Sequence, residues 1–406
     1  MTRDRRHVLP AARPCRTARS PGPAGEGGGS VGSMAVRPRR TTTAAIALTT
    51  VASLASAGCA DADSPSAPGA PQGGARSSQQ AEGAGSASAG VPRIDAPRSS
   101  GSGTGRSGPR VRVLAVSVDG LSVQAIRRLG RGGAPALHRM LGHGAGTLNA
   151  RTARETYVTL PNHTGMLTGR RVDADRGGHG VTWNHDRPGS TVHRAAGHRV
   201  GSIFSRVHGA GGRTALFAAK DKFSLFDRSW PIGRFVVDHD NADLVTAAIA
   251  DLRPARRAFT FVHLSLPDAA GHAHGGMSPK YLAAVREADA QVGRMLRAVH
   301  SGPRLRRQVR VILTADHGFA PGRRAHDADR MGNYRIPFLV WGRSIRRADL
   351  YRINPEFRRP GRRQSDYRGR QPIRNAMLAD LAADFLDLRS VRGSEFNHDQ
   401  RLDVHR

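Results

Sequence analysis

Short hydrophobic runs alternate with amphipathic stretches through the chain after residue 110. The runs rich in β-branched and aromatic residues, which predict buried strands, are residues 111–118, 214–218, 235–238, 259–266, 309–314 and 336–341. The stretches with apolar residues at helical spacing are residues 121–129, 134–141, 200–207, 242–252, 280–299 and 373–386. This alternation predicts an α/β fold with a mostly parallel central sheet and helices on both faces.

The N-terminal part of the chain has the layout of a secretory signal. Three arginines between residues 37 and 40 are followed by an apolar stretch at residues 43–54 and by small residues that lead to Cys59. The apolar stretch is short for a membrane span, which needs ~20 residues. Met34 directly precedes this layout, so we expect translation to begin there.

The residues around Cys59 resemble a bacterial lipobox, except that Ser56 stands where a leucine is usual. We therefore expect export, with a lipid-bearing Cys59 as the mature N-terminus; an ordinary cleaved signal with an incidental cysteine is the alternative. Residues 60–108 are rich in Ser, Gly, Ala and Pro and predict a flexible tether. The expected organisation is a leader at 1–59, a tether at 60–108 and a catalytic domain at 109–406.

Composition limits the possible functions. The net charge is +31, but only three of the 63 basic residues are lysines, and the arginines are scattered rather than interleaved with aromatic residues. We therefore expect no dedicated nucleic-acid site, although the charge favours acidic substrates. Cys15 and Cys59 are the only cysteines. A disulfide framework, a cysteine-based zinc site and a cysteine nucleophile are thus excluded from the body of the chain.

Acidic residues and histidines follow the predicted strands. The six candidates are Asp119, Asp268, His272, Asp316, His317 and His326. In doubly wound sheets, ligands bind at the carboxyl ends of the strands, so these side chains are expected to meet. Mixed Asp/His sets suit Zn²⁺, with Mn²⁺ or Fe as alternatives. Six ligands suffice for two ions ~4 Å apart, an arrangement that serves in-line phosphoryl displacement.

A hydroxyl nucleophile is available beside this cluster. Pro161 predicts a helix start that places Thr159 at the N-terminus, in a helix ending near Gly169. The helix dipole favours an anion there, and a metal ion would lower the pKa of the hydroxyl. Thr159 could also serve only as an N-cap, and Thr156 is the alternative nucleophile.

Taken together, the motifs resemble the type I phosphodiesterase/nucleotide pyrophosphatase family of the alkaline phosphatase superfamily, over about residues 110–345. The segments that carry the resemblance are Val118-Asp119-Gly120, Thr159-Leu160-Pro161-Asn162-His163, Trp183-Asn184, Pro267-Asp268-x-x-Gly271-His272 and Thr314-Ala315-Asp316-His317-Gly318. The resemblance implies an alkaline-phosphatase-like fold.

The resemblance also implies roles for single residues. One zinc ion would be held by Asp268, His272 and His326, and the other by Asp119, Asp316, His317 and the nucleophile Thr159. Asn184 matches an asparagine that donates to the phosphoryl oxygen. His326 follows His317 by only nine residues, which is nearer to compact bacterial members than to the nucleotide pyrophosphatases proper. The Thr159-x-Pro161-x-His163 pattern differs from the Cys-x-Pro-x-Arg motif of sulfatases.

Two of the three lysines, Lys220 and Lys222, lie in one short loop. Either could contact the anionic end of a substrate, or both could belong to a solvated loop. The expected function is an exported two-zinc hydrolase that cleaves phosphodiester or nucleotide pyrophosphate bonds through Thr159. The alternatives are a phosphomonoesterase or phosphonate hydrolase of the same superfamily and a surface binding protein with an inactive phosphatase fold.

Overall fold

The computed structural model describes residues 111–406 except 328, 397–399 and 406. The predicted leader, signal and tether at residues 1–108 lie outside the described residues. Among the described residues, no helix is both long enough and apolar enough to cross a membrane.

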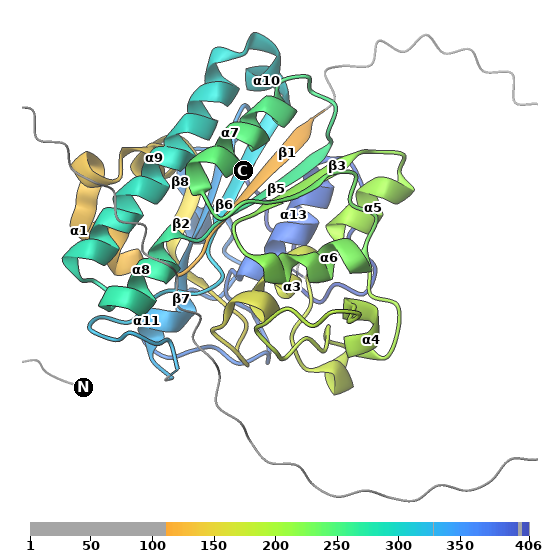
Figure 1. Ribbon diagram of the computed structural model, residues 1–406, viewed down its shortest axis with the longest axis horizontal. Coiled ribbons are helices and arrows are strands. Elements are labelled where there is room, and N and C mark those ends of the chain that lie inside the picture. The colour runs from red at the N-terminus through yellow and green to blue at the C-terminus, as the bar shows by residue number, and fades with distance from the viewer. Residues whose placement is uncertain (1–110, 328, 397–399, 406) are drawn as a thin grey trace, which may run out of the picture. The chain divides into compact units, whose positions relative to one another are not determined.

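One mostly parallel sheet forms the centre of the fold (Figure 1). Its strands are β1 (Arg112–Val118), β2 (Ala145–Arg151), β3 (Thr214–Ala218), β4 (Phe235–Val237), β5 (Phe259–Leu264), β6 (Val309–Thr314), β7 (Arg335–Gly342) and β8 (Ala348–Asp349). They lie in the order β4-β3-β5-β1-β6-β7-β2-β8, and β7 runs antiparallel to its neighbours β6 and β2. The predicted α/β fold with a mostly parallel sheet is confirmed.

The register of the three central strands brings their ends to one edge. On β1, Val118 pairs with Leu264 of β5, and Ser117 pairs with Thr314 of β6. Because all three strands run in parallel, the loops that follow them leave the sheet side by side. Asp119, the start of the helix after β5, and Asp316 therefore share this edge, which is called the catalytic edge below.

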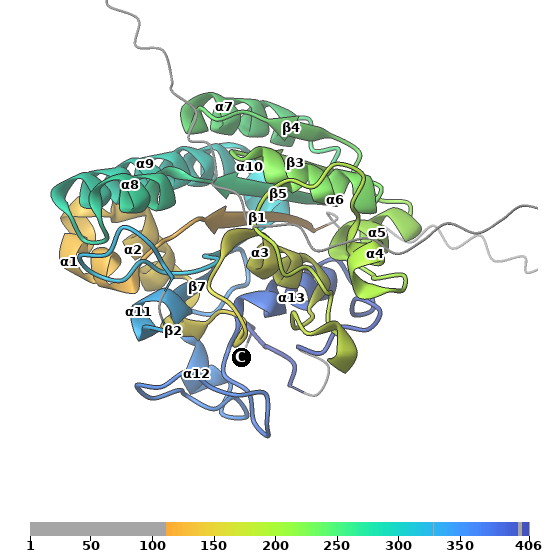
Figure 2. The ribbon, with the colours of Figure 1, turned by 60° about the horizontal axis from the view of Figure 1, so that its bottom comes forward.

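Helices cover both faces of the sheet (Figure 2). One face carries α1 (Val123–Gly133), α2 (Pro135–His143), α7 (Asn241–Leu252), α8 (Leu266–His274), α9 (Pro279–Ser301) and α10 (Pro303–Gln308), and the other carries α3 (Thr159–Thr168), α5 (Ile203–Gly209) and α13 (Leu378–Phe385). Shorter helices are α4 (Val192–Ala196), α6 (Ser224–Ser229), α11 (Met331–Tyr334) and α12 (Leu350–Ile353), and 3₁₀ turns occur at Ala174–Arg176, Asp221–Phe223 and Asn375–Met377.

Some element boundaries differ from the sequence prediction. The strand predicted at 259–266 ends at Leu264, because Pro267 lies in the first turn of α8, where its fixed φ suits a helix. The helix predicted at 373–386 begins only at Leu378, since the carbonyl of Ile373 accepts a bond from the Arg151 N–H and the backbone there is extended. Strands β2 and β8 were not predicted.

Candidate functional site

Three carboxylates meet at the catalytic edge. Asp119 follows β1, Asp268 lies in the first turn of α8 and Asp316 follows β6, and all three are buried. The Asp268 N–H donates to the Asp119 carbonyl at 3.1 Å. Gly120 permits this approach, because it has a φ of +68° and a Cβ there would lie 2.9 Å from the Asp268 Cα. The close packing of α8 on the end of β1 thus brings two of the acidic residues together.

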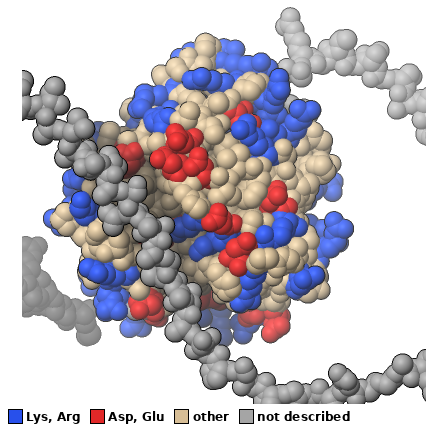
Figure 3. Space-filling model, viewed as in Figure 1, with Lys and Arg blue, Asp and Glu red and all other residues tan. Residues whose placement is uncertain are grey.

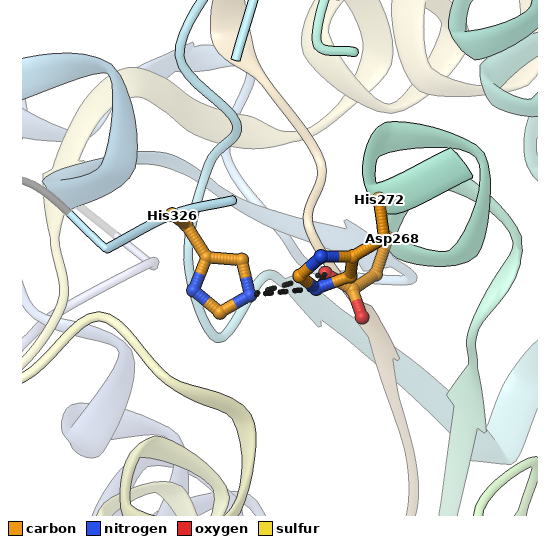
Figure 4. A group of neighbouring side chains, drawn as sticks. All are labelled: Asp268, His272 and His326. Carbon is orange, nitrogen blue, oxygen red and sulfur yellow. Dashed lines mark hydrogen bonds and ion pairs between the residues drawn. The ribbon is translucent and has the colours of Figure 1, made fainter. Parts of the chain in front are cut away.

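The first group of possible metal ligands is Asp268, His272 and His326 (Figure 4). Asp268 and His272 come from α8, and His326 from the loop after β6. The Asp268 Oδ1 lies 3.4 Å from the Nε2 of each histidine, and the two Nε2 atoms are 3.1 Å apart. The structure therefore brings together the three residues that the sequence assigned to one ion.

The orientation of His272 is suited to metal binding. Its Nδ1 lies 2.9 Å from the Arg324 carbonyl, which can only accept a hydrogen bond, so Nδ1 carries the proton. The Nε2 lone pair then points at Asp268 and His326. A carbonyl that fixes the tautomer of a histidine in this way is a common partner of metal-binding imidazoles.

The second group lies deeper in the molecule. The His317 Nε2 is 3.3 Å from Asp119 Oδ1, 3.2 Å from Asp316 Oδ2 and 3.8 Å from Asp268 Oδ1. The His317 Nδ1 lies 2.8 Å from the carbonyl of Gly318, which again leaves Nε2 as the ligand atom. Asp119, Asp316 and His317, which the sequence assigned to the second ion, are thus also adjacent. Asp268 lies between the two groups.

These residues fit divalent cations. Ten buried side-chain N and O atoms of the described residues lack a hydrogen-bond partner, and four of the ten belong to this cluster: Asp119 Oδ1, Asp268 Oδ1, Asp316 Oδ2 and His317 Nε2. Buried polar atoms without partners are costly and therefore rare. Ligand atoms of a tetrahedral zinc ion are ~3.3–3.5 Å apart at normal bond lengths, close to the spacings found here. Burial and the nearby Asp119 charge also raise the pKa of Asp316, so a cation bound in this cluster would favour the ionised form of this carboxylate.

Lys220 binds the outer oxygens of two of these carboxylates. Its Nζ lies 2.6 Å from Asp119 Oδ2 and 2.6 Å from Asp268 Oδ2. Burial opposes the charge of this lysine, but the two carboxylates raise its pKa. Each carboxylate therefore uses Oδ2 for Lys220 and keeps Oδ1 for the histidines. The ammonium group of Lys222 makes no hydrogen bond or ion pair with described residues, and burial together with the Lys220 charge lowers its pKa.

His263 supports the same site and was missed in the sequence analysis. This buried residue of β5 accepts a bond from the Ala219 N–H on Nδ1 at 3.2 Å, so its Nε2–H donates to Asp119 Oδ2 at 3.0 Å. Burial lowers the pKa of His263, although the bond to Asp119 opposes this, so the ring is neutral. The signal available in the sequence was a histidine inside an apolar strand, one strand away from Asp119.

Thr159 begins α3 beside the second group of ligands. The carbonyl of Thr159 accepts a bond from His163 Nδ1 at 2.8 Å, and the same nitrogen lies 3.7 Å from Asp316 Oδ2. Asn184 is bound to this helix start, because its Oδ1 accepts the Leu160 N–H at 2.9 Å. This bond leaves the Asn184 amide NH₂ without a partner among the described residues, so it is available to a ligand.

Few backbone donors of the first turn of α3 remain. Pro161 has no N–H, Leu160 donates to Asn184, and the N–H of Asn162 lies 3.4 Å from the Val158 carbonyl. The Thr159 N–H is the donor of this turn that has no partner within the described part of the chain. Thr156 is less suited to attack, since its Oγ1 accepts a bond from the Val158 N–H at 3.3 Å.

Known proteins are similar to this chain in sequence over one segment and in fold. The family model for type I phosphodiesterase / nucleotide pyrophosphatase matches residues 180–372, a segment that contains the candidate ligands except Asp119 and begins after Thr159. A structure of mouse ectonucleotide pyrophosphatase/phosphodiesterase 5, an inactive threonine-to-alanine variant in complex with AMP, is similar with a TM-score of 0.51 and 14% identity. The similarity covers 69% of this chain and 96% of the mouse chain.

A second structure of the same mouse protein has a TM-score of 0.49 at 14% identity, with 69% and 96% of the two chains covered. No curated protein matches the chain. At 14% identity the structural similarity shows the fold alone, and the family and its reaction class rest on the family model. The family model and the fold together support the assignment of the chain to the type I phosphodiesterase/nucleotide pyrophosphatase family of the alkaline phosphatase superfamily, and with it to the phosphoric ester hydrolases.

Proposed function

We propose that the protein is a two-zinc phosphodiesterase in which Thr159 is the nucleophile. The observation that carries the proposal is the set of four buried ligand atoms without partners, together with the start of α3 beside Asp316. Asp268, His272 and His326 would hold one ion, and Asp119, Asp316 and His317 the other. When bound, two such ions lower the pKa of a coordinated hydroxyl and offset negative charge on the attacking and leaving oxygens.

The residues of the chain have separate tasks in this reaction. The Thr159 Oγ1 attacks phosphorus, a bond from phosphorus to this oxygen forms, and the bond to the leaving oxygen breaks. The Asn184 NH₂ and the Thr159 N–H donate to the phosphoryl oxygens as charge develops on them. Water then cleaves the phosphothreonine and restores the hydroxyl. Two in-line displacements give net retention of configuration at phosphorus.

Two further observations bear on the substrate. The similar mouse structure is described as an inactive threonine-to-alanine variant in complex with AMP, which supports a threonine nucleophile and a phosphate-ester substrate. Among the described residues Lys222 has no anionic partner, and it lies two residues from Lys220, so it is a cation available to an anionic group of the substrate. A strong requirement for such a group would favour the monoesterase or phosphonate hydrolase alternatives.

The decisive experiment combines metal analysis with a substrate panel. The purified full chain is treated with chelator, reloaded with zinc or manganese and assayed with a diester, a monoester, a nucleotide pyrophosphate and a phosphonate. We expect about two zinc ions per chain and diester hydrolysis that is lost with the metal. Asp316→Ala should remove metal as well as rate. Hydrolysis that persists in metal-free protein would overturn the proposal.

The cellular address is part of the proposal and rests on residues outside the described part of the chain. We propose an exported lipoprotein anchored through Cys59, because the charged start, the apolar stretch and the cysteine occur in the right order. Cys59→Ser should release the protein from the membrane fraction, and mass spectrometry of the wild type should show an acylated N-terminal cysteine. If the Cys59→Ser variant were anchored normally, the lipid anchor would be wrong and only the proposed export would stand. If the leader remained intact on cytosolic protein, both the export and the lipid anchor would be contradicted.

A further inference from the structure

A strongly basic groove lies at the edge of the sheet opposite the catalytic edge. It has a volume of about 780 Å³ and is lined by five arginines, two histidines and Trp341, with no acidic residue. The arginines are Arg139 of α2, Arg306 and Arg307 of α10, and Arg343 and Arg347 after β7. Val309, which begins β6, and Gly342, which ends the antiparallel β7, also line it, so the groove marks the end where the parallel strands begin.

The arginines of this groove are unpaired. Among the described residues, none of the five guanidinium groups forms an ion pair with a carboxylate or donates to a carbonyl, and all five side chains are exposed. Arg139 alone has a partner, the ring of Trp341 at 5.9 Å. Figure 3 shows basic side chains gathered around the end of the molecule that carries α10 in Figure 1. Like charges held together without counter-charges form a site for a polyanion.

A second basic cavity differs from the groove because some of its arginines are hydrogen-bonded to the protein. The cavity of about 920 Å³ beside α5 is lined by four arginines and two histidines. Arg170, however, donates to the carbonyls of Gly177 and Arg392, and Arg206 donates to the carbonyl of Ser390. Two of its four guanidinium groups therefore bind the protein itself, whereas those of the groove remain available.

The chain enters the domain at the same edge as the groove. Arg112 begins β1 and pairs with Val309 of β6, the strand whose first residue lines the groove. The described part of the chain therefore begins at this edge and not at the catalytic edge. A membrane anchor on the N-terminal side of β1 would favour this edge over the catalytic edge as the one that faces the membrane.

We propose that the groove, defined by Arg139, Arg306, Arg307, Arg343 and Arg347, is a docking surface for anionic phospholipid head groups. Basic residues near an anionic surface add attraction one by one. The groove would therefore add to the attachment that the proposed anchor provides. The catalytic edge would then face away from the membrane. The argument rests in part on the proposed anchor at Cys59, but the test below does not.

The test measures binding to vesicles by two variants with the same change in charge. Both are made in the full chain carrying Cys59→Ser, so that no acyl chain contributes. The groove variant replaces Arg306, Arg307, Arg343 and Arg347 with Gln. The matched control replaces the exposed Arg358, Arg359, Arg362 and Arg363 with Gln. This control segment contacts β2 through Asn149 and Arg151, near the catalytic edge.

Sedimentation with vesicles of phosphatidylglycerol and phosphatidylcholine in equal parts, at physiological ionic strength, gives the partition coefficient. We expect the groove variant to lose roughly six hundredfold in binding, because each of the four basic residues contributes about a factor of five, and the control to lose far less. Hydrolysis of a soluble diester should be unchanged in both. Equal losses in the two variants would show a net-charge effect and overturn the proposal. Unchanged vesicle binding with lost binding of pyrophosphate or of an oligonucleotide would overturn it as well.

Discussion

Thr159 is the residue on which the proposed mechanism depends most, and its neighbours make the prediction specific. Thr159→Ala should keep both metal ions, because the Asp and His ligands remain, yet lose several orders of magnitude in kcat. The loss of an attacking group exceeds the ~10²–10³ of one oxyanion donor. Thr159→Ser should keep part of the rate, since the hydroxyl remains. Metal content and turnover of a soluble diester measure both effects.

Thr156→Ala is the control for this series. Its hydroxyl accepts a bond from the Val158 N–H and shapes the approach to α3, so we expect a small change in rate. An inactive Thr156→Ala beside an active Thr159→Ala would move the nucleophile to Thr156. The phosphoryl group of the substrate would then bind near Thr156, three residues before the start of α3.

Lys220 is expected to act on the ligands rather than on the substrate. Lys220→Met would leave two buried carboxylates without their common partner, which costs about 3–5 kcal/mol in the metal-free protein. Added zinc should reduce the loss of stability caused by Lys220→Met, since the ions supply the missing positive charge. Urea unfolding with and without zinc measures the effect, and Lys222→Met is the control because Lys222 pairs with no carboxylate. Equal destabilisation in the two metal states would contradict the positioning role of Lys220.

For single residues, the sequence predicted which side chains belong to the candidate site better than it predicted the contacts between them. The candidate ligands could be expected near one another because they follow strands, and parallel strands end at one edge. The contribution of His263 could not, because its partner Asp119 is 144 residues away and only the sheet order joins them. The same holds for Lys220, for which the sequence left open a substrate contact or a solvated loop, and which bridges Asp119 and Asp268.

Among the elements, α2 depends on a cap supplied by another helix. Its N-terminus has no side-chain cap of its own; Asp289 of α9 accepts the N–H groups of Ala136 and Leu137 at 3.0 and 2.8 Å. Because Asp289 is buried, water cannot replace it. Asp289→Ala should therefore lower the free energy of unfolding by about 2–3 kcal/mol, as measured by chemical denaturation.

The exposed cap of α7 provides the comparison. Asp240 accepts the N–H groups of Ala242 and Asp243 in the same way, but solvent can reach them. Asp240→Ala should cost only about 1 kcal/mol. If the two variants lost equal stability, burial of the Asp289 cap would not be the cause.

Elements with a strong pattern were predicted, and elements made by pairing were not. Strands such as β1 and β6 are mostly apolar runs buried on both faces, which is the clearest strand signal. By contrast, β2 has the sequence AGTLNAR, with one β-branched residue, and exists because β7 and β8 pair with it. Its neighbour β7 was recognisable from its own hydrophobic run.

For the molecule as a whole, the two edges of the sheet carry different chemistry. The catalytic edge gathers buried carboxylates and histidines, whereas the opposite edge exposes unpaired arginines. The high positive charge of the chain is therefore expected to act differently at the two edges of the sheet. Along the sequence the arginines are scattered, and the groove could not be foreseen because residues from α2, α10 and the segment after β7 form it only in three dimensions.

The sheet order also determines when the metal site can form. Gly120 and Asp316 are in contact across 196 residues, and His263 and Asp119 across 144, so the ligands come together only after the distant central strands have paired. Such pairing is slow, and interactions formed after the transition state act on unfolding rather than on folding. Zinc at about 100 times its dissociation constant would stabilise the folded protein by about 2.7 kcal/mol. Chelator should then shorten the lifetime of the folded protein roughly a hundredfold and leave the rate of refolding unchanged.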